Sequence, residues 1–461
     1  MTLNITRILA EFADDLSYDD LPENVRDRTK TLILDITGNI IRARHDAEST
    51  PPLLRAIARM GLGQGNSTVL GDGRTYSPVA SAMINGTLAH SLDFDDTHAG
   101  GSIHSSAPIV PAALAAAELA GAEGDALIAA IVAGYEIQIR LSLALNPSDH
   151  YDRGFHPTAT CGIFAATAAA GKLLGLDANG LESAFGIALS QAAGSMQFLA
   201  DGSWTKRSHV GQAAQNGMMA ALLASEGFVG PKQALEGKWG FLHSHAPNAD
   251  GEKAVADLKS RWMTMELALK PYPSCRYTHA AIDGLVELMQ SNNISVDEIE
   301  KVAIGLPETG LKIVAIPLSE KQEPGSIVDG QFSMPFCAAV ALREGSLQWD
   351  HYKTQLDDAA TLALCKKIDV GPDADAEAAF PRFMSGKATI YARGESFEKF
   401  VEIPLGEPEN FLTRDAQVEK FESLAGPYMR TDAISKAPGI VFALDEPGKL
   451  STFLALAREV A

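Results

Sequence analysis

The fold is decided by a stretch rich in small residues, TATCGIFAATAAAGKLL at positions 158–174. Its apolar side chains recur at helical spacing, and its many Ala and Gly residues let neighbouring helices approach closely. Pro157 precedes it, at the position that proline favours at the start of a helix. Similar patterns cover residues 106–145, 181–200 and 210–226, and helical spacing also follows Pro22. The first 265 or so residues therefore predict an almost wholly helical body.

The pattern changes after Lys270. Residues 302–306 and 312–316 are predicted to form short strands. Residues 387–403 are predicted to form a hairpin with a Gly-containing turn at 393–396. This part of the chain is therefore expected to contain a sheet.

Helical patterns at 282–290 and 336–343 lie among these strands, and the chain becomes helical again from Asn410. The middle section is therefore a separate α+β domain, and the C-terminus could rejoin the first one. We predict a mainly α protein: residues 1–267 and 405–461 form a large all-helical domain, and residues 268–404 form a smaller α+β domain.

The composition excludes several classes of partner. The 461 residues include 38 Lys and Arg against 58 Asp and Glu, a formal net charge of −20. With no long basic run, neither nucleic acid nor a membrane is expected as a partner. The four cysteines lack metal-ligand or redox spacing. The first ten residues lack the basic and apolar regions of a signal peptide, so we expect a cytoplasmic protein.

Carboxylates and imidazoles are concentrated before the helix predicted from residue 106. Three of each fall within fifteen residues: His90, Asp93, Asp95, Asp96, His98 and His104. A purely structural segment has little reason to carry this density. The alternatives are a solvated acidic loop with capping residues, and a metal site, because Asp and His are suitable ligands.

A further histidine, His156, lies in the motif GFHPT at 154–158, at the N-terminal end of the predicted helix. The positive end of the helix dipole disfavours an imidazolium there, while free backbone amides attract a carboxylate. His156 is thus either a neutral catalytic group or a cap.

Basic residues also precede two other predicted helices, around Lys206 and around Lys270. Each lysine alone is more often a surface residue. Together with His104 and His156, however, they mark four helix starts, each with unsatisfied amide donors and positive potential. If these ends converge, they form a pocket for a small molecule with several carboxylates. Its histidines could exchange protons near neutral pH, and its lysines could stabilise an enolate-like charge.

Read together, these motifs resemble the MmgE/PrpD family of cofactor-independent enzymes, which includes 2-methylcitrate dehydratases, cis-aconitate decarboxylases and an iminodisuccinate epimerase. The matching segments, in family order over nearly the full chain, are GTLAHSLDFDDT at 86–97, GFHPT at 154–158, TK at 205–206 with HVG at 209–211, and KPYPSC at 270–275. The resemblance implies an all-helical domain made from both chain ends, an inserted α+β lid domain, and a homodimer with the active site in the cleft between domains.

The family's active-site residues carry over to Asp93, Thr97, His104, His156, Lys206 and Lys270. The resemblance implies an enzyme, with no metal or other cofactor, that makes or breaks a carbon–hydrogen bond next to a carboxylate of a small di- or tricarboxylic acid. We favour a hydro-lyase of the 2-methylcitrate dehydratase type. An epimerase of the iminodisuccinate type and a decarboxylase of the cis-aconitate type stay open.

In this hypothesis His104 or His156 acts as general base or acid. Lys206 and Lys270 hold substrate carboxylates and stabilise the enolate charge. Asp93 orients or tunes a histidine, and Thr97 donates a hydrogen bond. His209 and Arg276 are further candidate substrate-binding residues.

Two departures limit the choice of substrate. The chain has His104-Ser105-Ser106 where the dehydratases and decarboxylases resemble one another in a His-Pro-Ser run. Phe336 aligns with a lid-domain tyrosine of the decarboxylases, so the pocket is expected to lack that hydroxyl.

Two other classes of protein remain as alternatives. A metal-dependent hydrolase would use Asp93, Asp95, Asp96, His98 and His104, but their spacing fits no familiar ligand motif and the lysines would be unexplained. A non-catalytic scaffold would have no need to keep buried ionisable groups.

Overall fold

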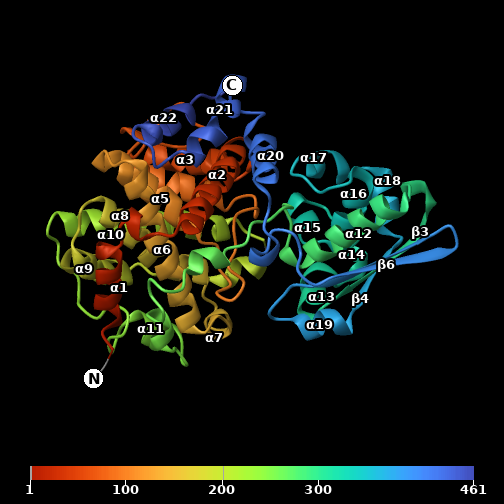
Figure 1. Cartoon of the computed structure of the whole chain (residues 1–461), viewed down its shortest axis with the longest axis horizontal. Helices are drawn as coiled ribbons and strands as arrows, with labels where there is room; N and C mark the ends of the chain where they lie inside the picture. The colour runs from red at the N-terminus through yellow and green to blue at the C-terminus, as the bar shows by residue number, and fades with distance from the viewer. Residues whose placement is uncertain (1–2, 201) are drawn as a thin grey trace. The chain divides into compact units, whose positions relative to one another are not determined.

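The computed structural model describes residues 3–200 and 202–461. The chain divides into two compact units. Unit 1 contains the chain up to Ala268 together with Thr413–Ala461, and unit 2 contains Leu269–Leu412. Most elements are helices, and a small mixed sheet lies in unit 2 (Figure 1). The predicted mainly α fold class is confirmed.

Unit 1 is built from helices of both chain ends, beside a two-stranded ribbon of β1 (Ser67–Thr68) and β2 (Thr75–Tyr76). Its helices are α1 (Ile5–Asp15), α2 (Glu23–Asp46), α3 (Thr50–Arg59), α4 (Pro78–Ala89), α5 (Ser106–Ala120), α6 (Gly124–Leu145), α7 (Pro147–Asp152), α8 (Pro157–Leu173), α9 (Ala178–Leu189), α10 (Thr205–Ser225), α11 (Phe241–His245), α20 (Arg414–Ala425), α21 (Thr431–Phe442) and α22 (Lys449–Leu456).

Helix α8 forms the centre of the unit 1 core. All of its residues except Lys172 are buried, and α5, α6 and α10 pack against it. Helices α4 and α10 approach closely at Gly86 and Gly211, where a Cβ on Gly211 would clash with Thr87. Because a larger side chain there would push the helices apart, the small residues bring the end of α4 and the start of α10 together.

Two predicted helical stretches are interrupted. Residues 106–145 form two helices, because Gly121 takes a left-handed conformation (φ 64°) that ends α5. Helix α9 ends at Leu189, and only a 3-10 turn, Met196–Ala200, follows before residue 201. The reason is tertiary: Ser195 forms a β-bridge with Phe155, which draws this segment out of the helix.

Among the described residues, α6 is the one helix long and apolar enough to cross a membrane. Its most apolar window is almost entirely buried within the fold. Because its apolar surface is already covered by other helices, α6 is accounted for as a core helix.

Unit 2 contains a four-stranded sheet in the order β4-β3-β5-β6. Its strands are β3 (Ile299–Leu306), β4 (Ile368–Pro372), β5 (Gly386–Ala392) and β6 (Glu395–Val401). Strands β3 and β4 are parallel, and the other neighbours are antiparallel. Helices α12 (His279–Asn292) and α16 (Met334–Glu344) pack against the sheet. The remaining helices are α13 (Glu308–Val314), α14 (Leu318–Lys321), α15 (Ile327–Gln331), α17 (His351–Gln355), α18 (Ala359–Cys365) and α19 (Ala374–Ala379).

The predicted hairpin is confirmed as β5 and β6, joined by Arg393 and Gly394, which both have positive φ as a tight hairpin turn requires. The strand predicted at 312–316 is wrong, because most of this stretch belongs to helix α13. There Leu311 and Val314 are buried at helical spacing while Ile313 is partly exposed, so one helical face, and not alternate residues, meets the core.

Candidate active site

The predicted site residues divide between the two units. Asp93, Thr97, His104, His156, Lys206 and His209 belong to unit 1, and Lys270 and Arg276 belong to unit 2.

The ends of four helices bring the unit 1 residues together. His90 caps the C-terminus of α4, His104 lies just before α5, and His156 is the N-cap of α8, as predicted for it. Lys206 lies within the first turn of α10 and not ahead of the helix, with His209 almost one turn later. Because α10 packs against α4, α5 and α8, these ends converge.

Hydrogen bonds hold the main chain of both candidate catalytic histidines. The His104 N–H donates to Thr158 Oγ1 at 3.2 Å, and its carbonyl accepts from Gln138 at 3.3 Å. The His156 N–H donates to the Gly194 carbonyl at 2.9 Å. The first turn of α8 thus places both residues.

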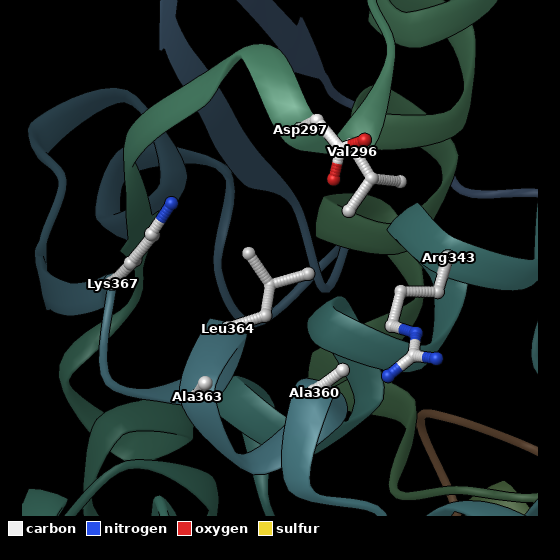
Figure 2. Close-up of a pocket in the computed structure, with 7 residues that line it drawn as sticks. All are labelled: Val296, Asp297, Arg343, Ala360, Ala363, Leu364 and Lys367. Atoms are coloured by element: carbon white, nitrogen blue, oxygen red, sulfur yellow. The ribbon is translucent and has the colours of Figure 1, made fainter.

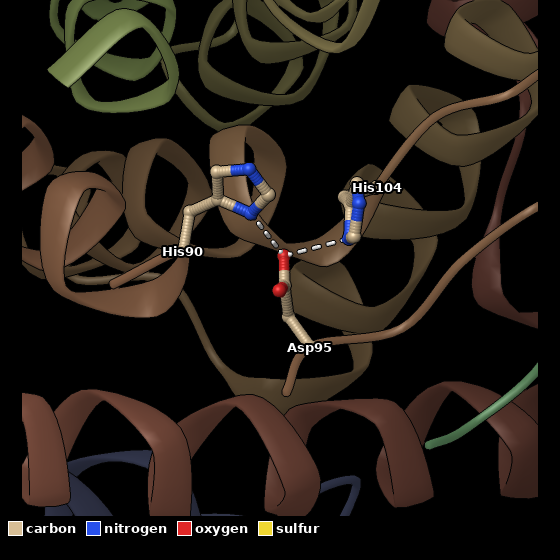
Figure 3. A group of neighbouring side chains, drawn as sticks. All are labelled: His90, Asp95 and His104. Atoms are coloured by element: carbon tan, nitrogen blue, oxygen red, sulfur yellow. Dashed lines mark hydrogen bonds and ion pairs between the residues drawn. The ribbon is translucent and has the colours of Figure 1, made fainter. Parts of the chain in front are cut away.

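Asp95 lies between two imidazoles (Figure 3). Its Oδ2 is 2.8 Å from His90 Nδ1 and 3.1 Å from His104 Nδ1. The two rings meet edge to face, with centroids 4.5 Å apart. Burial alone would raise the pKa of Asp95, but the two imidazoles outweigh it and hold that pKa well below its usual range. Asp95 is therefore a buried carboxylate anion.

His156 extends this group of rings. Its ring centroid is 6.0 Å from that of His90 and 5.8 Å from that of His209. Burial, followed by the positive potential of its neighbours, lowers the pKa of His156 well below its usual range. Burial also lowers the pKa of His90, to about 4, and that of His209. These rings are neutral at neutral pH and can accept a proton.

A cation accompanies the neutral rings. Lys206 Nζ lies 2.7 Å from Asp93 Oδ1. Burial lowers the pKa of Lys206, but the Asp93 carboxylate outweighs it and the net shift is upward, so the ammonium stays charged. Asp93 itself has a left-handed backbone (φ 53°), which Asp tolerates better than most residues.

The acidic cluster proposed for a metal-dependent hydrolase does not assemble as predicted. The Asp96 carboxylate accepts the N–H groups of Ser105 and Ser106, each at 3.1 Å, and so holds the start of α5. His98 Nε2 faces Glu266 at 3.3 Å. A different trio, shown in Figure 3, has potential ligand atoms within 4.8 Å of one another: His90, Asp95 and His104.

Asp96 and Thr97 hold the loop in place. Burial raises the pKa of Asp96 to about 6, and the neighbouring Asp95 adds to the rise. The buried Thr97 pairs its main chain with Ala268 in both directions, at 3.0 and 2.8 Å. Asp96 therefore anchors the loop between α4 and α5 to the start of α5, and Thr97 anchors it to Ala268.

The unit 2 residues have their own surroundings. Lys270 is buried and lies nine positions ahead of α12, close to the helix start that the sequence predicts. The buried Arg276 guanidinium donates to Glu407. Phe336 is fully buried within α16, with its ring against Tyr352.

Unit 2 also has a cavity of about 410 Å³ that contains none of the predicted residues (Figure 2). The two basic side chains that line it already have partners within the protein. Arg343 pairs with Asp358, and Lys367 donates to the Ile299 carbonyl. Both cations of this cavity thus already have protein partners, whereas the histidine group of unit 1 has polar atoms available to a ligand.

Buried polar atoms without a hydrogen-bond partner in the described part of the chain gather around the unit 1 site. They include His90 Nε2, Asp95 Oδ1, His104 Nδ1, Ser105 Oγ, His156 Nδ1 and His209 Nδ1. Because buried polar atoms are nearly always satisfied in folded proteins, such a gathering indicates a place for water or ligand.

Sequence reasoning gave His90 no role and considered Asp95 only as a metal ligand. The available signal was their density in one segment. The contacts of Asp95 with His90 and His104 depend on how the loop after α4 folds back. A periodic sequence pattern does not predict that fold.

A helical body with buried neutral imidazoles, a carboxylate anion and a charged lysine is an arrangement suited to acid–base chemistry. Residues 7–253 match the MmgE/PrpD N-terminal domain and residues 272–437 match the MmgE/PrpD C-terminal domain. The chain belongs to the MmgE/PrpD family, as its motifs predict.

Its curated relatives include cis-aconitate decarboxylases. The protein from Aspergillus terreus is 28% identical over 485 residues, covering 98% of this chain and 95% of the relative. A cis-aconitate decarboxylase-like protein, oryM, from Aspergillus oryzae is 28% identical over 483 residues, covering 98% and 97%. The Homo sapiens cis-aconitate decarboxylase is 26% identical over 465 residues, covering 97% and 93%.

Proposed function

We propose that this protein is a lyase that moves a proton at a carbon next to a carboxylate of a small di- or tricarboxylic acid. The observation that carries the proposal is the convergence of Lys206, His104 and His156 at helix ends in unit 1, beside buried polar atoms that lack partners. A protonated lysine and helix N-termini attract carboxylates, and neutral imidazoles accept protons.

The residues would divide the work as follows. Lys206, held by Asp93, would bind a substrate carboxylate and stabilise the negative charge that develops when the neighbouring carbon loses a proton. One of His104 and His156 would take that proton, and the other would protonate the leaving group or the product carbon. Lys270, Arg276, Thr97 and His209 stay proposed substrate contacts.

The reaction subtype has two leading candidates. Dehydration of the 2-methylcitrate type is the subtype that we favour from the family resemblance, although the motifs themselves are shared by the whole family. Decarboxylation is favoured by the relatives that carry the name cis-aconitate decarboxylase, at 26–28% identity over nearly full length. An epimerase would need proton donors on both faces of one carbon, and the same residues could serve it.

A proton magnetic resonance assay in heavy water tests the proposal. The purified, chelator-treated protein is offered 2-methylcitrate, citrate, cis-aconitate and iminodisuccinate separately. We expect deuterium to appear next to a carboxylate with at least one acid. Loss of water would indicate the hydro-lyase, loss of carbon dioxide the carboxy-lyase, and exchange with inversion alone the epimerase. No change in any of the four would count against the proposed substrate class.

A metal-dependent hydrolase is the second candidate, because the side chains of His90, Asp95 and His104 lie close enough to share an ion. Metal analysis of the purified protein separates the two. A stoichiometric ion whose removal abolishes activity would favour the hydrolase, whereas full activity after chelation would favour the lyase.

The homodimer also stays a proposal, and a mass measurement in solution would test it. Several large apolar side chains of unit 1 are exposed and could belong to such an interface: Leu199, Phe228, Val229 and Trp239.

A further inference from the structure

The start of α10 carries a second cation that the proposed chemistry does not use. Arg207 follows Lys206 in the first turn of this helix. We propose that Arg207 binds a second carboxylate of the substrate, remote from the carbon that loses its proton, and thereby selects acids with two or more carboxylates. The assignment rests on the proposed function in taking a carboxylic acid as the substrate.

The Arg207 guanidinium has few partners within the protein. A guanidinium has five N–H donors. In the described part of the chain, that of Arg207 forms one long hydrogen bond, from Nη1 to Ser49 Oγ at 3.5 Å, and no ion pair. Its nitrogens are not among the buried polar atoms that lack a partner, so its remaining N–H groups face solvent. A bound molecule can therefore reach them.

Helix geometry places Arg207 at one side of the site. Successive side chains of a helix point about 100° apart. His209, whose ring lies beside that of His156, is therefore about 60° to one side of Lys206 around α10. Arg207 is about 100° to the other side. A carboxylate at Arg207 is thus farther from His156 than one at Lys206, and it is not the carboxylate next to the reacting carbon.

The charged residues of the site are also its accessible ones. The side chains of Lys206 and Asp93 are 27% and 15% exposed, and that of His104 is 15% exposed, whereas His90 is completely buried. Arg207 is likewise partly exposed. A substrate that enters on this accessible side meets both cations of the first turn of α10.

The charge and shape of Arg207 suit a carboxylate. Burial lowers the pKa of Arg207, and the carboxylates of Asp93 and Glu48 oppose that fall. Arginine stays protonated at neutral pH, so the guanidinium is a permanent cation. Asp93 already pairs with Lys206. The planar guanidinium can hold a carboxylate through two parallel hydrogen bonds, whereas a lysine acts as a point charge.

The experiment compares two probes that differ by one carboxylate, succinate and butyrate, in calorimetric titrations of the full chain. The natural protein should bind succinate more tightly. R207M keeps the apolar length of the side chain, and its affinity for succinate should fall by about 10- to 100-fold while its affinity for butyrate stays the same. R207K retains the charge without the fork and should lose less. K206M should bind both acids more weakly.

R55M is the matched control, because Arg55 is exposed on α3, the helix that follows Ser49. It should leave both affinities unchanged, and circular dichroism checks that each variant is folded. The proposal is overturned if R207M binds succinate as the natural protein does, or if it loses both acids equally. A natural protein that binds succinate no better than butyrate would overturn it as well.

Kinetics separate this proposal from the proposed reaction. With the acid identified in the heavy-water assay, R207M should raise KM with little change in kcat, as expected when a contact remote from the reacting carbon is removed. Selective loss of succinate binding without turnover of any acid would uphold the second carboxylate site and reject the reaction. Turnover with an unchanged KM in R207M would reject the second carboxylate site alone.

Discussion

Lys420 Nζ lies 3.0 Å from the main-chain carbonyl oxygen of Phe94, 326 positions earlier in the chain. The same ammonium is 2.6 Å from Asp35 Oδ1 and lies over the Phe94 ring, 3.7 Å from its centroid. Asn39 donates to the same carbonyl at 3.3 Å. Phe94 stands between Asp93 and Asp95, so α20 and α2, from opposite chain ends, hold the loop that carries both carboxylates of the site.

Replacing Lys420 with Met should therefore disturb both stability and turnover. It leaves the buried Asp35 without its cation, which typically costs about 3–5 kcal/mol of the free energy of unfolding, and it frees the Phe94 carbonyl. Urea unfolding and kcat measure the two effects. The matched control is K436M on the exposed face of α21, where the change should stay within about 0.5 kcal/mol. Equal behaviour of the two variants would contradict a role for Lys420.

Replacing Lys206 with Met should lower kcat by about 100-fold or more while the fold stays intact. The ammonium is the charged group proposed to stabilise the developing anion, and methionine keeps most of the apolar length of this largely buried side chain, so little packing is lost. Steady-state kinetics with the acid identified in the heavy-water assay, together with circular dichroism, measure this. The control is K253M, whose lysine is more exposed. Near-normal turnover in K206M would reject the proposed role.

Separate H104A and H156A variants should show which histidine is the base. The variant without the base should lose both turnover and deuterium exchange, by about 100- to 10,000-fold. The variant without the acid should lose turnover but keep exchange at the substrate carbon, because proton removal precedes the step that needs the acid. Full turnover in either variant would show that its histidine is dispensable.

The protein should become less stable as the pH falls from about 6.5 towards 4. His90 has its pKa lowered from 6.5 to about 4 by burial, so its neutral form favours folding. This contribution is fully present above the unfolded pKa and is lost as the pH falls through the folded one. For His90 alone it is of the order of 3 kcal/mol, and His156 acts in the same direction. Urea titrations at several pH values measure it. H90Q should show a shallower pH dependence, and an unchanged slope would contradict the burial of a neutral His90.

Much of the architecture is predictable from local patterns. The periodicity of residues 158–174 and Pro157 predict helix α8 and place His156 at its N-cap, as found. The hairpin of β5 and β6 follows from alternation around a Gly-containing turn. These predictions succeed because helix caps, periodicity and tight turns depend on residues a few positions apart. The strand predicted at 312–316 fails because the face of a short apolar run that is buried depends on its neighbours in space.

The amino-acid sequence by itself determined the helical class, the family motifs and the group of residues from which the site is drawn. Only the tertiary structure decided which of those residues meet. Asp95 lies between His90 and His104, Asp96 holds the start of α5, and Lys420 reaches the Phe94 carbonyl. These pairings depend on the close crossing of α4 and α10 and on the docking of α20 beside α2. Residues far apart in the chain acquire such partners only when the core packs, because side-chain contacts across helices are set by packing and not by sequence spacing.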